Sequence, residues 1–375
     1  MSRTEIRIQN ESLSRIGQGC MGVGGRFSAD TSRDAEQIQA LRQGIELGMT
    51  FIDTAEVYGA GHSEELVGRA VRGQRNEVFL ASKVSPEHLS PGDLMTSCEE
   101  SLRRLGVDYL NLYQIHWPNP AVPIDETLGA MVRLREQGKI CHLGVSNFSL
   151  PELKRIQCIL GSVPLFSVQA EYNLFERGAE EEIIPWCARN GMLFIAYSPL
   201  DQGRVVGSAV VRKQLTVAAG RLGFTPSQVA LNFLSSRGPV LTIPKAIRSD
   251  HIRENATACD IPIPAPLLEE IDRECRVEVN LVPWRQIQPA VDSSGEHRVY
   301  TTIEEARANP AGHSPSPLEL AEEIRGADRI KPIRVTPIDG SAKEYRYTLA
   351  EGRLRFWAWV LAFNGRRDVP VLVRD

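Results

Sequence analysis

The sequence predicts an α/β protein, a closed parallel barrel followed by a small α+β domain. From about residue 12 to residue 278, eight short apolar runs alternate with helical patterns. After about residue 278 the pattern changes and cysteine disappears from the chain, and residues 282–317 are rich in Pro, Ser and Gly, which predicts a linker or irregular lead-in. Because a repeated strand-then-helix order favours a closed barrel over an open sheet, we expect a (β/α)8, or TIM, barrel. The expected domains are residues 1–278 and 279–375.

Short apolar runs that end near polar residues mark the barrel strands. They are Ile16–Met21, Thr50–Asp53, Val78–Lys83, Tyr109–His116, Ile140–Ser146, Ser167–Gln169, Leu193–Tyr197 and Val240–Pro244. Stretches with helical periodicity fill the intervals between them. The expected helices include Asp34–Leu47, Gly92–Leu105, Ile124–Glu136, Pro151–Ile159, Glu180–Asn190 and Ser227–Ser235. Asp34 is the expected N-cap of the first helix, and Ser149 opens a capping box.

Composition narrows the class of protein. The chain has 375 residues, 42% of them hydrophobic, and a net charge of −4, which argues against bulk attraction to nucleic acid or to an anionic membrane. No apolar run reaches the ~20 residues of a membrane span, and the polar N-terminus lacks the apolar segment of a signal peptide. Seven dispersed cysteines predict reduced thiols and no zinc site. We therefore expect a cytoplasmic protein with a small-molecule partner and no metal.

Four polar residues carry the functional prediction: Asp53, Lys83 and His116 each end an apolar run, and Tyr58 follows Asp53 after a short turn. The carboxyl ends of barrel strands meet at one rim, where chemistry takes place in this architecture. A cation close to a phenol stabilises the phenolate and lowers its pKa. The four side chains therefore predict a tuned proton donor with an unusually acidic phenol.

The glycine-rich start of the barrel matches a dinucleotide-binding pattern, Gly17-Gln-Gly-Cys-Met-Gly22. Such a turn needs a helix directly after it, and Val23-Gly24-Gly25 is a poor helix start. We interpret the segment as a first strand and loop whose backbone at Gly19, Cys20 and Met21 lies beside whatever fills the barrel mouth.

Several motifs, in order along residues 10–278, resemble the aldo-keto reductase family. They are Gly48-Met-Thr-Phe-Ile-Asp-Thr-Ala-Glu-Val-Tyr-Gly59, Leu112-Tyr-Gln-Ile-His-Trp-Pro118, Gly144-Val-Ser-Asn-Phe148, Gln169-Ala-Glu-Tyr-Asn173, Tyr197-Ser-Pro-Leu200 and Ile243-Pro-Lys245. The resemblance implies hydride transfer between a nicotinamide cofactor and a carbonyl or alcohol. It implies Tyr58 as general acid, Lys83 lowering its pKa, Asp53 holding Lys83 charged, and His116 orienting the carbonyl.

The resemblance also implies cofactor contacts. It assigns Ser146, Asn147 and Gln169 to the nicotinamide carboxamide, Tyr197 to ring stacking, and Ser198 and Leu200 to the pyrophosphate. It places Lys245 and the following residues, including Arg248 and His251, at the adenosine phosphate, and Glu254 and Asn255 near the adenine.

Two departures from the family pattern concern cofactor choice. Ala246 and His251 stand where members that prefer the phosphorylated dinucleotide often have a hydroxyl residue and an arginine. We favour NADP(H) over NAD(H), because Lys245 and Arg248 are placed to pair with a 2′-phosphate. Specificity in this fold resides in the loops at the barrel mouth, where Phe27, Trp117 and Phe148 are the expected apolar wall.

Residues 282–375 resemble the N-terminal domain of ParB-like proteins, a superfamily that includes sulfiredoxin and a free-serine kinase. The matching pieces are Val282–Pro289, Lys331–Val335, Tyr347–Ala358 and Val369–Val373, with expected strands around a turn at Asp339-Gly340. The resemblance implies that Gly352, Arg353 and Arg355 contact the phosphates of a nucleotide such as ATP or CTP, and that Glu351 has an acid–base or metal role. A purely structural role for this domain stays open.

Two alternatives to a simple reductase remain. The barrel would hold a cofactor as a redox sensor in a regulatory protein, or the C-terminal domain would itself be a nucleotide-dependent small-molecule kinase. The sequence identifies neither the carbonyl substrate nor the oligomeric state.

Overall fold

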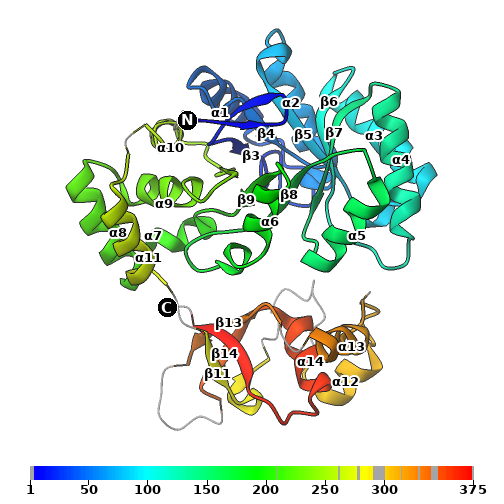
Figure 1. Ribbon diagram of the computed structural model, residues 1–375, viewed down its shortest axis with the longest axis vertical. Coiled ribbons are helices and arrows are strands. Elements are labelled where there is room, and N and C mark those ends of the chain that lie inside the picture. The colour runs from blue at the N-terminus through cyan, green and yellow to red at the C-terminus, as the bar shows by residue number, and fades with distance from the viewer. Residues whose placement is uncertain are drawn as a thin grey trace. The chain divides into compact units, whose positions relative to one another are not determined.

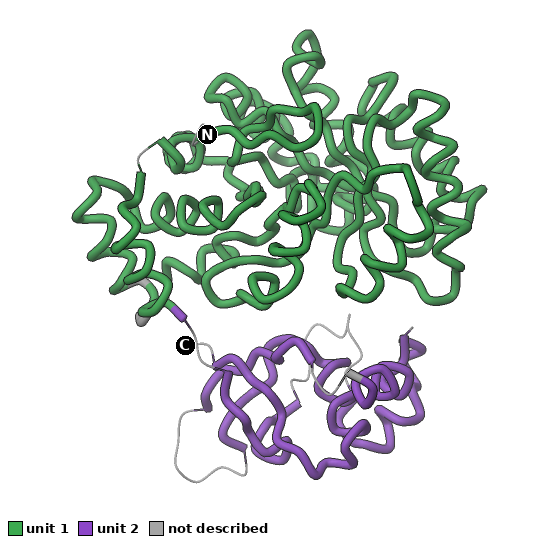
Figure 2. Tube along the Cα trace, viewed as in Figure 1, with its two compact units in different colours: residues 1–275 green, residues 276–375 purple. Residues whose placement is uncertain are grey.

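A computed structural model describes residues 4–207, 209–260, 262–276, 279–289, 300–313, 315–327, 330–338 and 345–373. The chain divides into two compact units, residues 1–275 and 276–375 (Figure 2). Each unit is described by itself.

The first unit is built on an eight-stranded parallel sheet in which each strand pairs with its neighbours in chain order. The strands are β3 (Gln18–Gly19), β4 (Phe51–Asp53), β5 (Phe79–Val84), β6 (Leu110–Ile115), β7 (Ile140–Ser146), β8 (Leu165–Glu171), β9 (Leu193–Tyr197) and β10 (Val240–Thr242). A parallel bridge between Ile16 and Thr242 joins the first strand region to the last strand and closes the sheet. The expected parallel barrel is confirmed.

Helices surround the barrel strands (Figure 1). They are α1 (Asp34–Glu46), α2 (His62–Val71), α3 (Pro91–Leu105), α4 (Ile124–Glu136), α5 (Leu150–Leu160), α6 (Ile183–Arg189), α7 (Arg204–Gly207), α8 (Ala209–Leu222), α9 (Pro226–Ser235), α10 (Ser249–Ala256) and α11 (Ala265–Glu274). Because helices cover the outside and side chains fill the inside, a strand such as β5 is buried at every position. Each helix of the described residues is too short or too polar to cross a bilayer.

An antiparallel hairpin of β1 (Glu5–Ile8) and β2 (Glu11–Ser14) precedes the barrel and was not expected from the sequence. Its buried side chains Ile6, Ile8 and Leu13 belong to one core cluster with Phe51 and Phe79, which begin strands β4 and β5. The hairpin therefore packs against the amino ends of the strands, opposite the rim that carries the predicted site.

Glycine lets the first strand approach its neighbours closely. A Cβ on Gly17 would lie 2.8 Å from the carbonyl oxygen of Phe51, and one on Gly19 would lie 2.5 Å from that of Ile243. Both distances are shorter than real Cβ contacts, so any side chain there would push the barrel seam apart. No helix follows this segment before Asp34, in keeping with the interpretation of a strand and loop.

The two expected helix starts had different outcomes. The capping box of α5 is confirmed, because Ser149 and Glu152 exchange side-chain and backbone hydrogen bonds. The N-cap assigned to Asp34 was wrong. Arg33 is the cap residue, and Asp34 lies in the first turn, where its carboxylate contacts His62 and Arg69.

The second unit contains a five-stranded mixed sheet in the order β11-β15-β13-β14-β12. The strands are β11 (Asn280–Val282), β12 (Ile287–Gln288), β13 (Ile333–Pro337), β14 (Tyr347–Glu351) and β15 (Val369–Val373), with helices α12 (Ile303–Ala308), α13 (Pro317–Ala327) and α14 (Arg353–Ala362). The last helix brings Phe356 and Trp357 into the unit's own core.

Regular elements occupy part of the stretch 282–317, which we expected to be a linker or irregular lead-in. Strand β12 and helix α12 lie within it, and β11 ends at its first residue. The expected turn at Asp339-Gly340 lies outside the described residues.

Candidate active site

The four predicted residues reach one rim because of where the strands end. Asp53 is the last residue of β4, Lys83 lies one residue before the end of β5, and His116 follows β6 directly. Tyr58 opens the short 3-10 turn Tyr58–Gly61 that leads from β4 into α2. The parallel register therefore brings an acid, an amine, an imidazole and a phenol to neighbouring strand ends.

Asp53 and Lys83 form a buried ion pair. The Lys83 Nζ lies 2.5 Å from Asp53 Oδ2 and also donates to the carbonyl oxygen of Thr54 at 2.8 Å. The Lys83 side chain is fully buried, and that of Asp53 is 3% exposed. Burial by itself lowers the pKa of Lys83, but the carboxylate of Asp53 and the phenol of Tyr58 outweigh it and hold that pKa above its ordinary value. The site therefore keeps a permanent ammonium.

Tyr58 lies against this ammonium, with its ring centroid 5.0 Å from Lys83 Nζ. Burial raises the pKa of Tyr58 and the Lys83 ammonium lowers it, while the Asp53 carboxylate raises it again. The net direction in this structure is upward, opposite to the acidic phenol that we expected from the sequence. The reason is that the phenol is almost completely buried, and desolvation disfavours the phenolate more than one already neutralised ammonium favours it.

His116 completes the group. Its ring packs edge to face on the Tyr58 ring, with centroids 5.6 Å apart. Burial, together with the positive charge of Lys83, lowers the pKa of His116 to about 3. The imidazole is therefore neutral near pH 7 and presents one N–H donor and one acceptor.

Two glutamines converge on the same carboxylate. Gln169 Nε2 donates to Asp53 Oδ1 at 2.8 Å, and Gln114 Nε2 donates to the same oxygen at 3.2 Å. We expected Gln169 at the nicotinamide carboxamide, and in this structure its side chain is bonded to Asp53. Gln114 was missed, although the two-residue period of a strand places it on the same face of β6 as His116.

Residues assigned to the nicotinamide gather beside His116. Tyr197 donates its hydroxyl to Asn147 Oδ1 at 2.9 Å, and Asn147 Nδ2 donates to the carbonyl oxygen of His116 at 3.0 Å and to Ser146 Oγ at 2.9 Å. Asn147 and Ser198 have positive φ angles of 68° and 48°. Left-handed backbone at residues other than glycine is a feature of ligand-contacting turns.

A cavity lies at the other end of the predicted cofactor path. It is enclosed by β3, by α1 and by the segment from the end of β10 into α10, and its lining includes Gly19, Ala246 and Asn255. The structure thus brings together Gly19 and Asn255, two of the residues assigned to the cofactor. Cys20 follows, fully buried, with its N–H donating to the Asp53 carbonyl oxygen at 2.9 Å, while Met21 is exposed.

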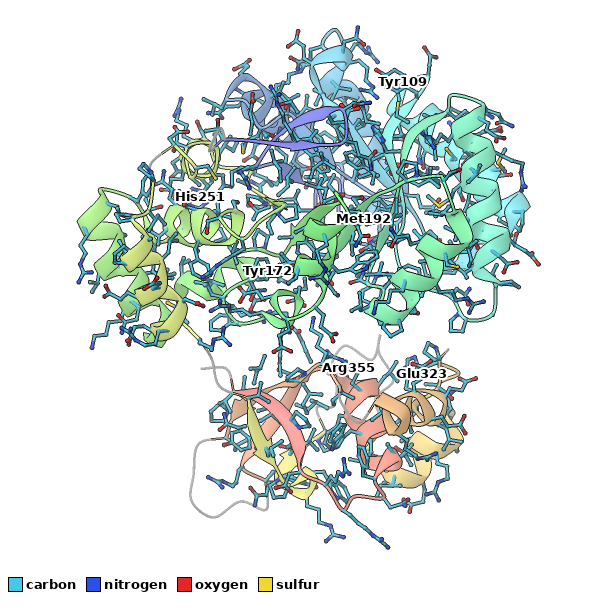
Figure 3. The ribbon with its side chains drawn as sticks, viewed as in Figure 1. Tyr109, Tyr172, Met192, His251, Glu323 and Arg355 are labelled. Atoms are coloured by element: carbon cyan, nitrogen blue, oxygen red, sulfur yellow. The ribbon has the colours of Figure 1, made fainter. Side chains whose placement is uncertain are left out.

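Of the cationic residues expected at the adenosine phosphate, Arg248 already has an acidic partner. Arg248 pairs with Asp250 at 2.5 Å, and both side chains are largely exposed. Burial, followed by the positive charge of Arg33, lowers the pKa of the Lys245 amine. His251 lies exposed on α10 (Figure 3), and Glu254 accepts a hydrogen bond from Thr225 at 3.4 Å.

Comparison with known proteins decides the family. The family model described as the aldo/keto reductase family matches residues 15–274. The chain belongs to the aldo-keto reductase family. It is therefore an oxidoreductase, and its catalytic fold is the parallel barrel described above.

This aldo-keto reductase is similar to characterised relatives over most of their length. It is 37% identical to methylglyoxal reductase YeaE of Escherichia coli over 263 residues, which are 70% of this chain and 91% of that protein. A thermostable aldo-keto reductase solved with the inhibitor epalrestat is 38% identical, with a TM-score of 0.69 over 72% of this chain and 98% of that one. An aldo/keto reductase from Klebsiella pneumoniae solved with NADP and acetate is 34% identical, with a TM-score of 0.67 over 73% and 96%.

The apolar residues expected at the barrel mouth of this reductase differ in exposure. Phe27 is 61% exposed and Trp117 is 49% exposed, whereas Phe148 is buried. Leu200 is partly buried and packs on the same core cluster as Ala246. Two large exposed aromatic side chains near the strand ends suit an apolar part of a substrate.

In the second unit of this reductase, Gly352 caps the start of α14 with a φ of 91° that favours glycine. Arg355 donates to the carbonyl oxygens of Lys331 at 2.7 Å and Pro332 at 3.3 Å. Glu351 forms an ion pair with Arg334, a buried side chain on β13. Two of the four residues expected to meet a nucleotide, Glu351 and Arg355, are therefore bonded within the unit itself.

Proposed function

We propose that this chain reduces a small carbonyl compound with NADPH, using Tyr58 as the proton donor. The observation that carries the proposal is the fully buried Asp53–Lys83 pair beneath the Tyr58 ring, with His116 beside it. A buried ammonium next to a phenol serves to stabilise the negative charge that the phenol acquires when it gives up its proton.

When bound, NADPH would supply a hydride for the carbonyl carbon. Tyr58 Oη donates its proton to the carbonyl oxygen as that oxygen becomes negative, so the products are an alcohol and a tyrosinate held by the Lys83 ammonium. The raised pKa of Tyr58 suits this direction, because the phenol is protonated at every pH near neutrality. The tyrosinate regains its proton from solvent before the next turnover.

His116 acts as a neutral donor. Its lowered pKa keeps the imidazole uncharged, so its N–H orients the carbonyl and donates to the developing oxyanion without competing for the Tyr58 proton. A charged imidazolium would also repel the Lys83 ammonium, which is one of the two causes of the lowered pKa.

We propose NADP(H) as the cofactor, with NAD(H) as the alternative. Lys245 and Arg248 would pair with the 2′-phosphate, and the relative from Klebsiella pneumoniae was solved with NADP. Arg248 must then exchange its contact with Asp250 for the phosphate, an exchange that two exposed side chains make at little cost. Ser146, Asn147 and Gln169 would hold the carboxamide, with Tyr197 stacked on the nicotinamide ring. Because all seven cysteines are free thiols, we propose that the enzyme works in the cytoplasm.

The Tyr58→Phe variant tests the mechanism. Loss of the hydroxyl should lower kcat by ~10²- to 10⁴-fold, because general acid catalysis contributes that range, while NADPH affinity stays within ~3-fold. Stopped-flow oxidation of bound NADPH by a panel of aldehydes, together with fluorescence titration of NADPH, gives both quantities. Unchanged turnover in the variant would refute the tyrosine mechanism. Slow turnover of the natural protein with every carbonyl would favour a redox sensor instead.

For the second unit we propose the ParB-like role of binding a nucleotide such as ATP or CTP. The supporting observation is Gly352, whose positive φ opens α14 with Arg353 and Arg355 in its first turn. Backbone N–H groups at a helix start, together with arginines, favour phosphate. Calorimetry of the full chain with ATP and CTP should show binding that Arg353→Ala weakens. Absence of any heat of binding in the natural chain would leave a structural role for the unit, and binding that Arg353→Ala did not weaken would place the nucleotide elsewhere. Release of diphosphate or monophosphate would indicate a kinase.

A further inference from the structure

The inside of the barrel contains a row of paired residues at the level of Lys83, and three of the four have polar side chains. Lys83, Gln114, Gly144 and Ser167 are paired across adjacent strands β5 to β8, each directly opposite the next. Paired residues in a sheet point to the same side, so all four belong to one interior layer of the barrel. A layer of this kind is normally filled with branched apolar side chains.

Gln114 is the member of this layer that reaches the ion pair. Its side chain is fully buried, its Nε2 donates to Asp53 Oδ1 at 3.2 Å, and its Oε1 accepts from Ser167 Oγ at 3.3 Å. Gln169 Nε2 lies 3.5 Å from the same Oε1. These partners determine the orientation of the amide, because an ionised carboxylate only accepts and the Ser167 hydroxyl has a donor to give.

Gly144 makes room for this arrangement. A Cβ on Gly144 would lie 2.3 Å from Ser167 Oγ and 2.8 Å from Gln114 Cγ. Both distances are too short for real atoms, so the Gln114 side chain occupies space that an alanine would take. The backbone at Gly144 has an ordinary φ, which leaves close approach as the reason for glycine.

The Asp53 carboxylate needs donors that stay in place. Its Oδ2 receives Lys83, and its Oδ1 receives Gln169 and Gln114. Water does not substitute, because Asp53 is only 2% exposed. Under the proposed function Gln169 also serves the nicotinamide carboxamide, so Gln114 is the donor to Oδ1 that has no second duty.

We propose that Gln114 is a positioning residue that fixes the Asp53 carboxylate, and through it the Lys83 ammonium beneath Tyr58, and that Gly144 provides the space it needs. The proposal deepens the proposed function and rests on it for its catalytic consequence. Gln114 itself touches neither substrate nor hydride. Its effect reaches the reaction through the orientation of the Asp53 carboxylate.

Three variants of this layer test the proposal. Gln114→Leu keeps the volume and removes the donor, so kcat should fall by ~10- to 100-fold, the size expected for a lost hydrogen bond to a charged group, with KM for the carbonyl unchanged within ~3-fold. Gly144→Ala should lower kcat in the same way by displacing the intact amide. Thr127→Val is the control, since Thr127 is equally buried but bonds only the Leu89 carbonyl oxygen on the barrel exterior.

Gln114→Glu separates positioning from packing. When protonated, the new carboxyl donates to Asp53 as the amide did, and when ionised it faces a second carboxylate. The kcat of Gln114→Glu, relative to that of the natural protein, should therefore be close to one near pH 5 and should fall as the pH rises. The relative kcat of Gln114→Leu should be low at every pH and should not change with pH. If Gln114→Glu and Gln114→Leu both had the kcat and the pH profile of the natural protein, the proposal would be overturned. Equal losses at every pH in both variants, with the fold intact by circular dichroism, would also overturn it in favour of packing.

A thermal unfolding series keeps this test separate from the proposed function. In the folded Gln114→Glu variant, burial and the nearby Asp53 raise the pKa of the new carboxyl, so its stabilising protonated form is lost as the pH rises through that value. The difference in Tm from the natural protein should grow with pH for Gln114→Glu, stay constant for Gln114→Leu, and grow less in an Asp53→Asn background. If the natural protein reduced no carbonyl but this pattern held, the proposed function would fail while the contact with Asp53 stood. A pH trend that Asp53→Asn did not change would overturn the contact.

Discussion

At the scale of single residues, the environment of the phenol and not its identity decides its chemistry. A tyrosine beside a lysine suggests an acidic phenol, but full burial and the Asp53 carboxylate act in the opposite direction to Lys83. The ammonium is largely neutralised by the carboxylate 2.5 Å away, so its effect on Tyr58 is smaller than that of a free cation. Under the proposed mechanism, Tyr58 would donate its proton near neutral pH, and Lys83 would matter most after the proton has left.

This arrangement predicts the pH dependence of the two reaction directions. Carbonyl reduction needs protonated Tyr58, and since burial raises its pKa above the ordinary value of ~10, kcat for reduction should stay flat from about pH 6 to pH 9. Alcohol oxidation needs the tyrosinate, so its kcat should rise throughout that range. Steady-state rates with one aldehyde–alcohol pair in both directions supply the measurement.

The same pH profiles test whether the His116 imidazole is neutral. Because burial and Lys83 lower its pKa to about 3, the imidazole stays neutral and contributes no acid limb between about pH 5 and pH 8. A limb near the ordinary histidine value of ~6.5 that disappeared in His116→Gln would contradict this assignment. A decline in reduction well below pH 9 would count against the raised pKa of Tyr58.

At the scale of elements, the sequence located the strands that carry the site but missed those that support it. Long apolar runs such as Phe79–Val84 are recognisable because both faces of a barrel strand are buried. The hairpin β1–β2 has only one buried face, so it offers three buried apolar residues within a polar segment and was not predicted. Gln114 was missed for a related reason, since a single glutamine within a strand has no distinguishing mark until its neighbours on β5 and β7 are known.

The hairpin predicts a separation of stability from activity. Leu13 is 3% exposed among the amino ends of the strands, so Leu13→Ala should lower the free energy of unfolding by ~2–5 kcal/mol, as for other buried leucines. Because the site lies at the opposite ends of the strands, kcat and KM at 20 °C or below should change by less than about twofold. Urea denaturation and steady-state kinetics measure the two effects.

Leu47→Ala is the matched control, because Leu47 is 40% exposed and should cost less than ~0.5 kcal/mol. Equal destabilisation by the two changes would show that the hairpin adds nothing to the core. A loss of turnover in Leu13→Ala while the protein remained folded would show that the hairpin is coupled to the rim.

At the scale of the whole molecule, the chain consists of two units with separate cores. The first unit closes its barrel through the bridge between Ile16 and Thr242, and the second packs Trp357 and Phe356 against its own sheet. Alternating apolar runs made the barrel predictable, since eight repeats of one pattern reinforce each other. The second unit has short strands without such repetition, which is why β11, β12 and α12 were taken for an irregular stretch.

Separate cores predict that the reductase works without the second unit. A chain ending at residue 278 keeps the barrel and the described rim residues from Asp53 to Asn255, so it should remain soluble and reduce the same aldehydes with kcat/KM within about threefold of the full chain. Residues 279–375 expressed alone should give a cooperative thermal transition, because their own buried cluster supplies a core. Insolubility of the shorter chain, or a loss of turnover that adding the separate second unit restores, would show that the two units act as one catalytic body. Independent behaviour would instead place any nucleotide effect of the second unit outside the hydride-transfer step, so that ATP or CTP would alter neither kcat nor KM of the full chain.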